Sequence, residues 1–111
     1  DVASFDKTLE VNLRGYFYMS VEAGKRMRAQ GGGSIVNVSS ANAITPGDKQ
    51  AVYSMTKAAI LNMTQAFANE CGQYNIRCNA LVPGVTKTKF AQALHDDESF
   101  LAPARARTPL N

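Results

Sequence analysis

Apolar positions along the chain alternate between long stretches of helical spacing and short β-branched runs. One long helix is predicted from Phe5 to about Arg28, with Ser4 as its N-cap, because Phe5, Leu9, Leu13 and Phe17 recur at four-residue spacing. The stretch SIVNVSS, residues 34–40, is a short β-branched run between glycines and serines, which predicts a strand. The first half of the chain is therefore expected to be a helix followed by a strand.

The second half of the chain repeats this order. A second long helix is predicted from about Ala51 to Gly72, where a glycine can end it. Residues 75–84, NIRCNALVPG, predict a buried strand that ends in a Pro-Gly turn, and a short helix is expected around residues 88–94. We assign no element beyond Asp96.

Helix, strand, helix and strand in this order indicate βαβ units, so we expect an α/β fold with a parallel sheet. In such sheets, ligands bind outside the carboxyl ends of the strands. The first predicted strand ends at Ser39 and Ser40, and the second ends at Pro83 and Gly84. If the strands are parallel, these residues lie on one edge, where the sequence predicts the chemistry.

Size and composition are those of one small globular domain. The chain has 111 residues, of which 45% are hydrophobic and 19% are charged, and this balance does not suggest disorder. The net charge is +3, and the densest basic cluster, Lys25, Arg26 and Arg28, falls late in a predicted helix, where the helix dipole favours cations. No nucleic-acid motif accompanies it, so we expect no nucleic-acid partner.

The number of cysteines and the hydropathy of the chain bear on where in the cell we expect the protein. Cys71 and Cys78 are too few for a disulfide framework or a metal quartet, so we expect two reduced thiols and no metal. No apolar run approaches the roughly 18 residues of a membrane span, and no signal peptide is visible. We therefore expect a cytoplasmic protein without a membrane partner.

The stretch AVYSMTKAAI, residues 51–60, carries the strongest candidate chemistry. Tyr53 and Lys57 are four residues apart near the start of the second predicted helix, so they share one helix face. A nearby ammonium favours the charged form of a phenol and would let Tyr53 exchange protons. Taken alone, the pair has an ordinary alternative, in which both polar tips simply reach solvent at a helix edge.

The motifs together resemble the short-chain dehydrogenase/reductase family. The matching stretches are EVNLRG (10–15), GGGSIVNVSS (31–40), YSMTK (53–57) and IRCNALVPGVTKT (76–88), in the order and spacing of the family. The resemblance implies part of a doubly wound Rossmann fold of the classical type, and an NAD- or NADP-dependent oxidoreductase. Such an enzyme interconverts a ketone and a secondary alcohol.

The resemblance also implies a role for each matching residue. Tyr53 would be the general acid and base at the substrate oxygen. Lys57 would lower the pKa of Tyr53 and bond the ribose hydroxyls of the cofactor. Ser40 would hold the substrate oxygen, and Asn12 would interrupt its helix locally and hold a water that links Lys57 to solvent. The remaining cofactor contacts implied by the family are Pro83, Gly84, Thr86 and Thr88.

Singly, each of these residues also has an ordinary interpretation. Ser40 could be a loop start or a helix cap, Asn12 could be a surface amide, and the pair at 83–84 could be a plain turn. GGG at 31–33 precedes a strand, whereas a dinucleotide loop follows one, so we interpret it as a connector. The joint occurrence of the motifs favours the enzyme.

The family's N-terminal strand and glycine-rich turn have no counterpart, and no Gly-x-Gly-x-x-Gly occurs. Together with a start at Asp1, this predicts that residues 1–111 are the catalytic half of a single Rossmann-type domain, with no second domain. Alone, they are expected to be poorly stable and inactive, because a parallel strand pair cut from its sheet exposes apolar surface. The alternative is a truncated, non-catalytic form that acts only as a subunit-association module.

The family pairs subunits through its two long helices, so the resemblance implies a homodimer or homotetramer of the complete protein. The partner of the site would be a small carbonyl or alcohol substrate. The residue that chooses NAD over NADP has no counterpart in the chain, and both cofactors stay open at this point, as does the identity of the substrate.

Overall fold

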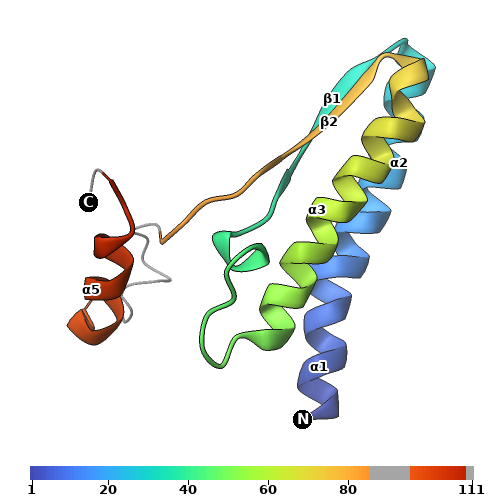
Figure 1. Cartoon of the computed structure of the whole chain (residues 1–111). Helices are drawn as coiled ribbons and strands as arrows, with labels where there is room; N and C mark the ends of the chain where they lie inside the picture. The colour runs from blue at the N-terminus through green and yellow to red at the C-terminus, as the bar shows by residue number, and fades with distance from the viewer. Residues whose placement is uncertain (86–95, 110–111) are drawn as a thin grey trace.

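A computed structural model describes residues 1–85 and 96–109, in which long helices lie against one face of a two-stranded sheet (Figure 1). The short helix expected at 88–94 and the candidate residues Thr86 and Thr88 fall outside these residues. In chain order the elements are α1 (Val2–Leu9), the π-helix η1 (Glu10–Arg14), α2 (Gly15–Gln30), β1 (Gly33–Val38), the 3₁₀ helix η2 (Ala41–Ala43), α3 (Ala51–Cys71), the 3₁₀ helix η3 (Gly72–Tyr74), β2 (Ile76–Leu81) and α5 (Glu98–Ala106).

The first helical segment is longer than predicted and is not uniform. The prediction of Ser4 as its N-cap is wrong: Asp1 caps it, since the Ser4 N–H donates to Asp1 Oδ1 over 2.7 Å. After α1 the helix widens into the π-helix η1 before it continues as α2. Gly31 then ends α2 in the left-handed region, with φ 93°, which glycine adopts without a steric cost.

The two strands are parallel, as the sequence predicted. Gly33 pairs with Ile76 and Val38 pairs with Leu81, so β1 and β2 run side by side in a fixed register. Each strand ends earlier than expected, β1 before Ser39 and β2 before Val82. The carboxyl ends of both strands therefore meet at one edge of the sheet, where the candidate residues lie.

Helix α3 starts at Ala51 as predicted and runs along the same side of the sheet as α2 (Figure 1). Gly72 does end the α-helix, but its φ of −55° is an ordinary helical value. The chain continues through η3, and Asn75 with φ 60° is the residue that turns it into β2. Asparagine tolerates this left-handed conformation better than most residues do.

The sheet has one covered face and one open face. Ile35, Ile76 and Cys78 are buried, and side chains from α2 and α3 pack against them, among them Met27 and Phe67. Both cysteines are free thiols, and burial is the main cause that raises the pKa of Cys78, with a further contribution from Cys71. On the other face Val36 is 55% exposed and Leu81 is 59% exposed. The cluster of Ile35, Ile76 and Cys78 thus lies between the sheet and the helix pair, and Leu101 of α5 is a further buried apolar residue.

The apolar residues that predicted the first helix, Phe5, Leu9, Leu13 and Phe17, do not form a buried stripe. Phe5 and Phe17 are exposed, and the Phe17 ring makes edge contacts with the rings of Tyr18 and Phe67, at 5.8 and 6.0 Å between centroids. A π-helix closes i→i+5 hydrogen bonds, so η1 shifts the helical phase between the two ends of the stripe.

Helix α5 is an element that the sequence analysis did not assign. Asp97 caps it, because its carboxylate accepts from the backbone N–H of Ser99 over 3.0 Å. It lies apart from the α2–α3 pair (Figure 1). None of the described helices combines the length and the hydropathy that crossing a bilayer requires.

Candidate active site

The loops that follow the two strands lie together. The Ser39 N–H donates to the Leu81 carbonyl over 2.8 Å, and the Ala41 N–H donates to the Pro83 carbonyl over 2.9 Å. These bonds continue the pairing of the strands beyond β1 and β2. They place Ser40 beside the Pro83 turn, as the sequence predicted for parallel strands.

The two adjacent serines have different surroundings. Ser39 is 2% exposed, and its hydroxyl donates to the Lys57 carbonyl over 2.7 Å, so it ties β1 to α3. Ser40 is only half-buried, and its Oγ accepts from the Asn42 N–H over 3.2 Å as it caps η2. An accepting hydroxyl keeps its own proton, so Ser40 can still donate a hydrogen bond to a ligand.

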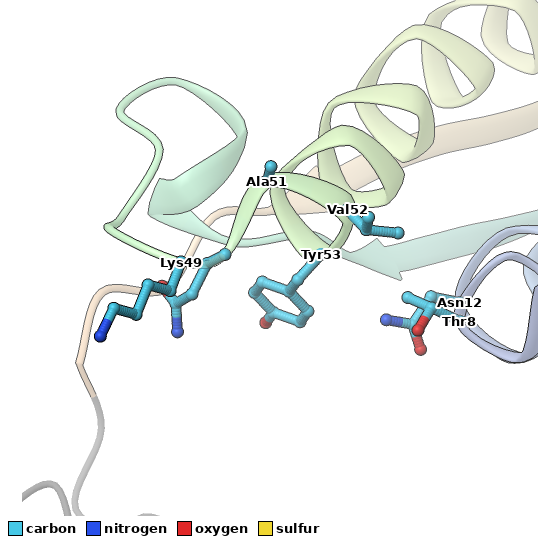
Figure 2. Close-up of a pocket in the computed structure, with 7 residues that line it drawn as sticks. Thr8, Asn12, Lys49, Ala51, Val52 and Tyr53 are labelled. Carbon is cyan, nitrogen blue, oxygen red and sulfur yellow. The ribbon is translucent and has the colours of Figure 1, made fainter. Parts of the chain in front are cut away.

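Tyr53 lies in the first turn of α3 and is 37% exposed. In Figure 2 its ring lies between Lys49 on one side and Asn12 and Thr8 on the other. These side chains line an open pocket of about 480 Å³, together with neighbours at the start of α3; the full lining is Thr8, Asn12, Lys49, Gln50, Ala51, Val52 and Tyr53. The phenol therefore faces space that a small molecule can enter.

The side chain of Lys57 is buried beneath Tyr53. Lys57 is 8% exposed, and its Nζ donates to the Val38 carbonyl over 3.0 Å. The same nitrogen lies 5.7 Å from the centre of the Tyr53 ring. Burial lowers the pKa of Lys57 from its ordinary value, because desolvation disfavours the ammonium.

Asn12 is at the centre of η1, so the local interruption of the helix implied by the resemblance is present. π-helical turns are rare in proteins and are frequent at functional sites. The half-buried Asn12 lines the same pocket as Tyr53, although the two come from different helices. The π-turn is thus the local feature from which the Asn12 side chain reaches the pocket.

The structure brings some of the candidates together more closely than others. Asn12 and Tyr53 share a pocket, and Lys57 lies behind Tyr53. Ser40 and the Pro83–Gly84 turn lie at the sheet edge rather than in the lining of this pocket. Within residues 1–85 and 96–109, no three His, Cys, Asp or Glu side chains gather where a metal ion could bind.

The sequence analysis missed two residues of the site. Tyr16 lies with its ring centre 5.1 Å from Lys57 Nζ, and Lys49 lines the pocket with a left-handed φ of 59°. Tyr16 follows Asn12 by four residues, and this spacing was the one signal that could have pointed to it. No sequence pattern marks Lys49.

Known proteins resemble the chain over most of its length. The family model described as "Enoyl-(Acyl carrier protein) reductase" matches residues 1–111. The chain is 42% identical over 105 residues to the NAD-dependent glycerol dehydrogenase of Listeria innocua, with 90% of this chain and 41% of that protein covered. It is 38% identical over 94 residues to the human dehydrogenase/reductase SDR family member 4, with 85% of this chain and 34% of that protein covered.

Solved structures share the fold. The gluconate 5-dehydrogenase from Burkholderia cenocepacia, in complex with NADP and tartrate, superposes with a TM-score of 0.86 at 30% identity. That comparison covers 90% of this chain and 39% of the dehydrogenase. The chain thus spans less than half the length of the relatives that it matches.

Proposed function

The chain belongs to the short-chain dehydrogenase/reductase family, and we propose that the complete protein is an NAD- or NADP-dependent oxidoreductase. It interconverts a ketone and a secondary alcohol, and residues 1–111 form the catalytic part of one Rossmann-type domain. The observation that carries this proposal is the phenol of Tyr53 at an open pocket with the buried ammonium of Lys57 beneath it. A buried cation beside a phenol favours proton exchange at the phenol oxygen.

The residues around Lys57 fit a nicotinamide cofactor. An ammonium has three N–H donors, and within the described part of the chain Lys57 uses one of them, on the Val38 carbonyl. The remaining donors suit the ribose hydroxyls of such a cofactor. Tyr53, Lys57, Pro83 and Gly84 would hold it, with Thr86 and Thr88 as further contacts from the segment outside the described residues. When bound, the cofactor supplies the hydride.

The protein's own groups would move the proton. In carbonyl reduction, the Tyr53 hydroxyl gives its proton to the substrate oxygen, and in alcohol oxidation it takes that proton back. The Ser40 hydroxyl donates a hydrogen bond to the same oxygen, since its own oxygen already accepts from Asn42. Asn12 holds a water on the path by which the proton returns from solvent. The open pocket in front of Tyr53 admits the substrate.

The experiment that tests this function is an assay of the complete protein against a panel of ketones and secondary alcohols with NAD(H) and NADP(H). We expect turnover of at least one pair with at least one cofactor. The 111-residue chain alone is expected to show none, because the exposed sheet face of Val36 and Leu81 leaves its fold incomplete. An inactive complete protein that still associates would favour the subunit-association module.

The proposed function includes pairing of subunits through the long helices. Exposed apolar side chains lie on α1, η1, α2 and α3, namely Val2, Phe5, Val11, Phe17, Tyr18, Met19 and Met55. An exposed set of this kind is typical of protein–protein interfaces. Met19, at 71% exposure, is the most exposed of them on α2.

Met19→Glu is therefore expected to weaken self-association of the complete protein, since it puts a charge into an apolar interface. The dissociation constant should rise about tenfold or more, as measured by sedimentation equilibrium. Met19→Leu keeps the apolar volume and is the matched control, which should associate like the parent. If Met19→Glu associates as tightly as Met19→Leu, this helix face is not the interface.

A further inference from the structure

The ammonium of Lys57 is a buried cation without an acidic partner in the described part of the chain. The ion pairs found there join Lys7 to Glu10, Lys25 to Glu22 and Arg105 to Glu98, and all of these side chains are exposed. Lys57 itself is 8% exposed. A buried ammonium is costly unless other groups compensate its lost hydration, so its neighbours must supply that compensation.

Two aromatic rings and one carbonyl surround this ammonium. Its Nζ lies 5.1 Å from the ring centre of Tyr16 and 5.7 Å from that of Tyr53, and it donates to the Val38 carbonyl over 3.0 Å. Both ring distances are within the roughly 6 Å at which the electron-rich face of an aromatic ring attracts a cation. The Tyr16 ring is the nearer of the two, and it comes from a different helix.

The charged side chains of η1 and β2 are directed elsewhere or exposed. On η1, Glu10 pairs with Lys7, and Arg14 lies over the Tyr18 ring at 5.5 Å. On β2, Arg77 is exposed on the open face of the sheet. Within the described part of the chain, the side chains in contact with Lys57 Nζ are the rings of Tyr16 and Tyr53, and no charged side chain forms an ion pair with it.

Tyr16 reaches Lys57 because of where it lies on its helix. It is the second residue of α2, directly after the π-turn that contains Asn12, and its side chain is half-buried. It thus contacts the lysine from α2, while Tyr53 contacts it from α3. The lysine tip is held between two helices and the end of β1.

We propose that Tyr16 is a positioning residue for the reaction: the face of its ring stabilises the charged form of Lys57 and holds the ammonium beside Tyr53. This inference rests on the proposed function, in which the Lys57 ammonium tunes the phenol and binds the cofactor ribose. It adds a second tyrosine to the site, one that touches neither substrate nor the reacting atoms. Loss of its ring should make Lys57 easier to deprotonate.

The test follows the titration of the Lys57 side chain in the complete protein by NMR with ¹³C-labelled lysine, with Lys57→Met used to assign the signal. In Tyr16→Leu the Lys57 pKa should fall by roughly 0.4 to 1.5 units, the range expected for one cation–π contact. Tyr16→Phe keeps the ring and should titrate close to the parent. The pH above which activity falls should move down in Tyr16→Leu by the same amount.

Tyr18→Leu is the matched control, because it removes an exposed tyrosine from the same helix and should leave the Lys57 titration unchanged. If Tyr16→Leu does not fold, phenylalanines with increasing fluorination at position 16 keep the shape and weaken the attraction of the ring. The Lys57 pKa should then fall stepwise. A Lys57 pKa that is the same in parent, leucine and fluorinated variants overturns the proposal. This readout needs no turnover, so it can fail or succeed independently of the proposed function.

Discussion

Tyr53→Phe in the complete protein is expected to lower kcat by about 10²- to 10⁴-fold, the usual contribution of a positioned general acid or base. The change removes one oxygen at the mouth of the pocket and keeps the ring that lies over Lys57. The substrate KM should change far less than kcat, because the lost contact acts mainly in the transition state. Steady-state kinetics with the preferred substrate pair measure both constants.

Tyr74→Phe is the matched control for this change. It removes the same atom from a half-buried tyrosine of η3, which follows the opposite end of α3 from Tyr53, and it should leave kcat unchanged. Ser40→Ala should lower kcat as well but by less, since it removes one hydrogen bond to the substrate oxygen rather than the proton donor. Near-normal turnover in Tyr53→Phe would show that the phenol is not the acid and base.

Lys57→Met is expected to lower kcat to a similar degree and also to weaken cofactor binding. The methionine fills most of the same volume but has no charge and no N–H donors. The variant thus loses the ammonium that favours proton exchange at the Tyr53 oxygen and also the proposed hydrogen bonds to the ribose. Cofactor affinity, measured by fluorescence titration of the complete protein, separates this result from that of Tyr53→Phe, which should bind cofactor almost normally.

The same variant tests the burial of the ammonium through the pH dependence of stability. Burial lowers the pKa of Lys57 in the folded state from its ordinary 10.5. Between the lowered value and 10.5, the unfolded chain binds the proton and the folded chain does not, so stability due to this group rises with pH. Below both pKa values the folded chain buries the charged ammonium, and the desolvation cost lowers its stability in full. Above both pKa values the amine is neutral in either state, and this cost is absent.

Lys57→Met should therefore lack this rise, which urea unfolding of the complete protein at a series of alkaline pH values can measure. Lys25→Met is the control, because Lys25 is an exposed lysine on α2 paired with Glu22. Its pH dependence should follow that of the parent. Parallel curves for the parent and Lys57→Met would mean that the ammonium is not buried in solution.

The local patterns of the sequence predicted most of the fold. Both strands and both long helices lie within a few residues of their expected bounds, because each has a clear periodicity and clear breaking residues at its ends. The sequence also predicted that the strands are parallel, so that Ser40 and Pro83 meet at one sheet edge, and the register confirms this. These predictions depended only on neighbouring residues and on general rules of chain connection.

The predictions that failed depended on choices between near-equal local alternatives. Ser4 and Asp1 can both cap a helix, and the structure uses Asp1. The cap at Asp97 with Glu98 behind it was a readable signal for α5, although Pro103 inside the helix obscured it. The four-residue spacing from Phe5 to Phe17 predicted the helix but not the π-turn within it, which changes the helical phase between these residues.

By itself, the sequence determined the element order, the family motifs and the neighbourhood of Tyr53 and Lys57, because four-residue spacing on a helix places two side chains on one face. Only the tertiary structure decided which of the two adjacent serines keeps a hydroxyl proton available and what surrounds the lysine. Ser39 is covered by α3 and bonds its backbone, whereas Ser40 stays half-buried. Tyr16 comes to Lys57 from another helix. Such contacts depend on how elements distant in sequence pack, and no local pattern encodes that packing.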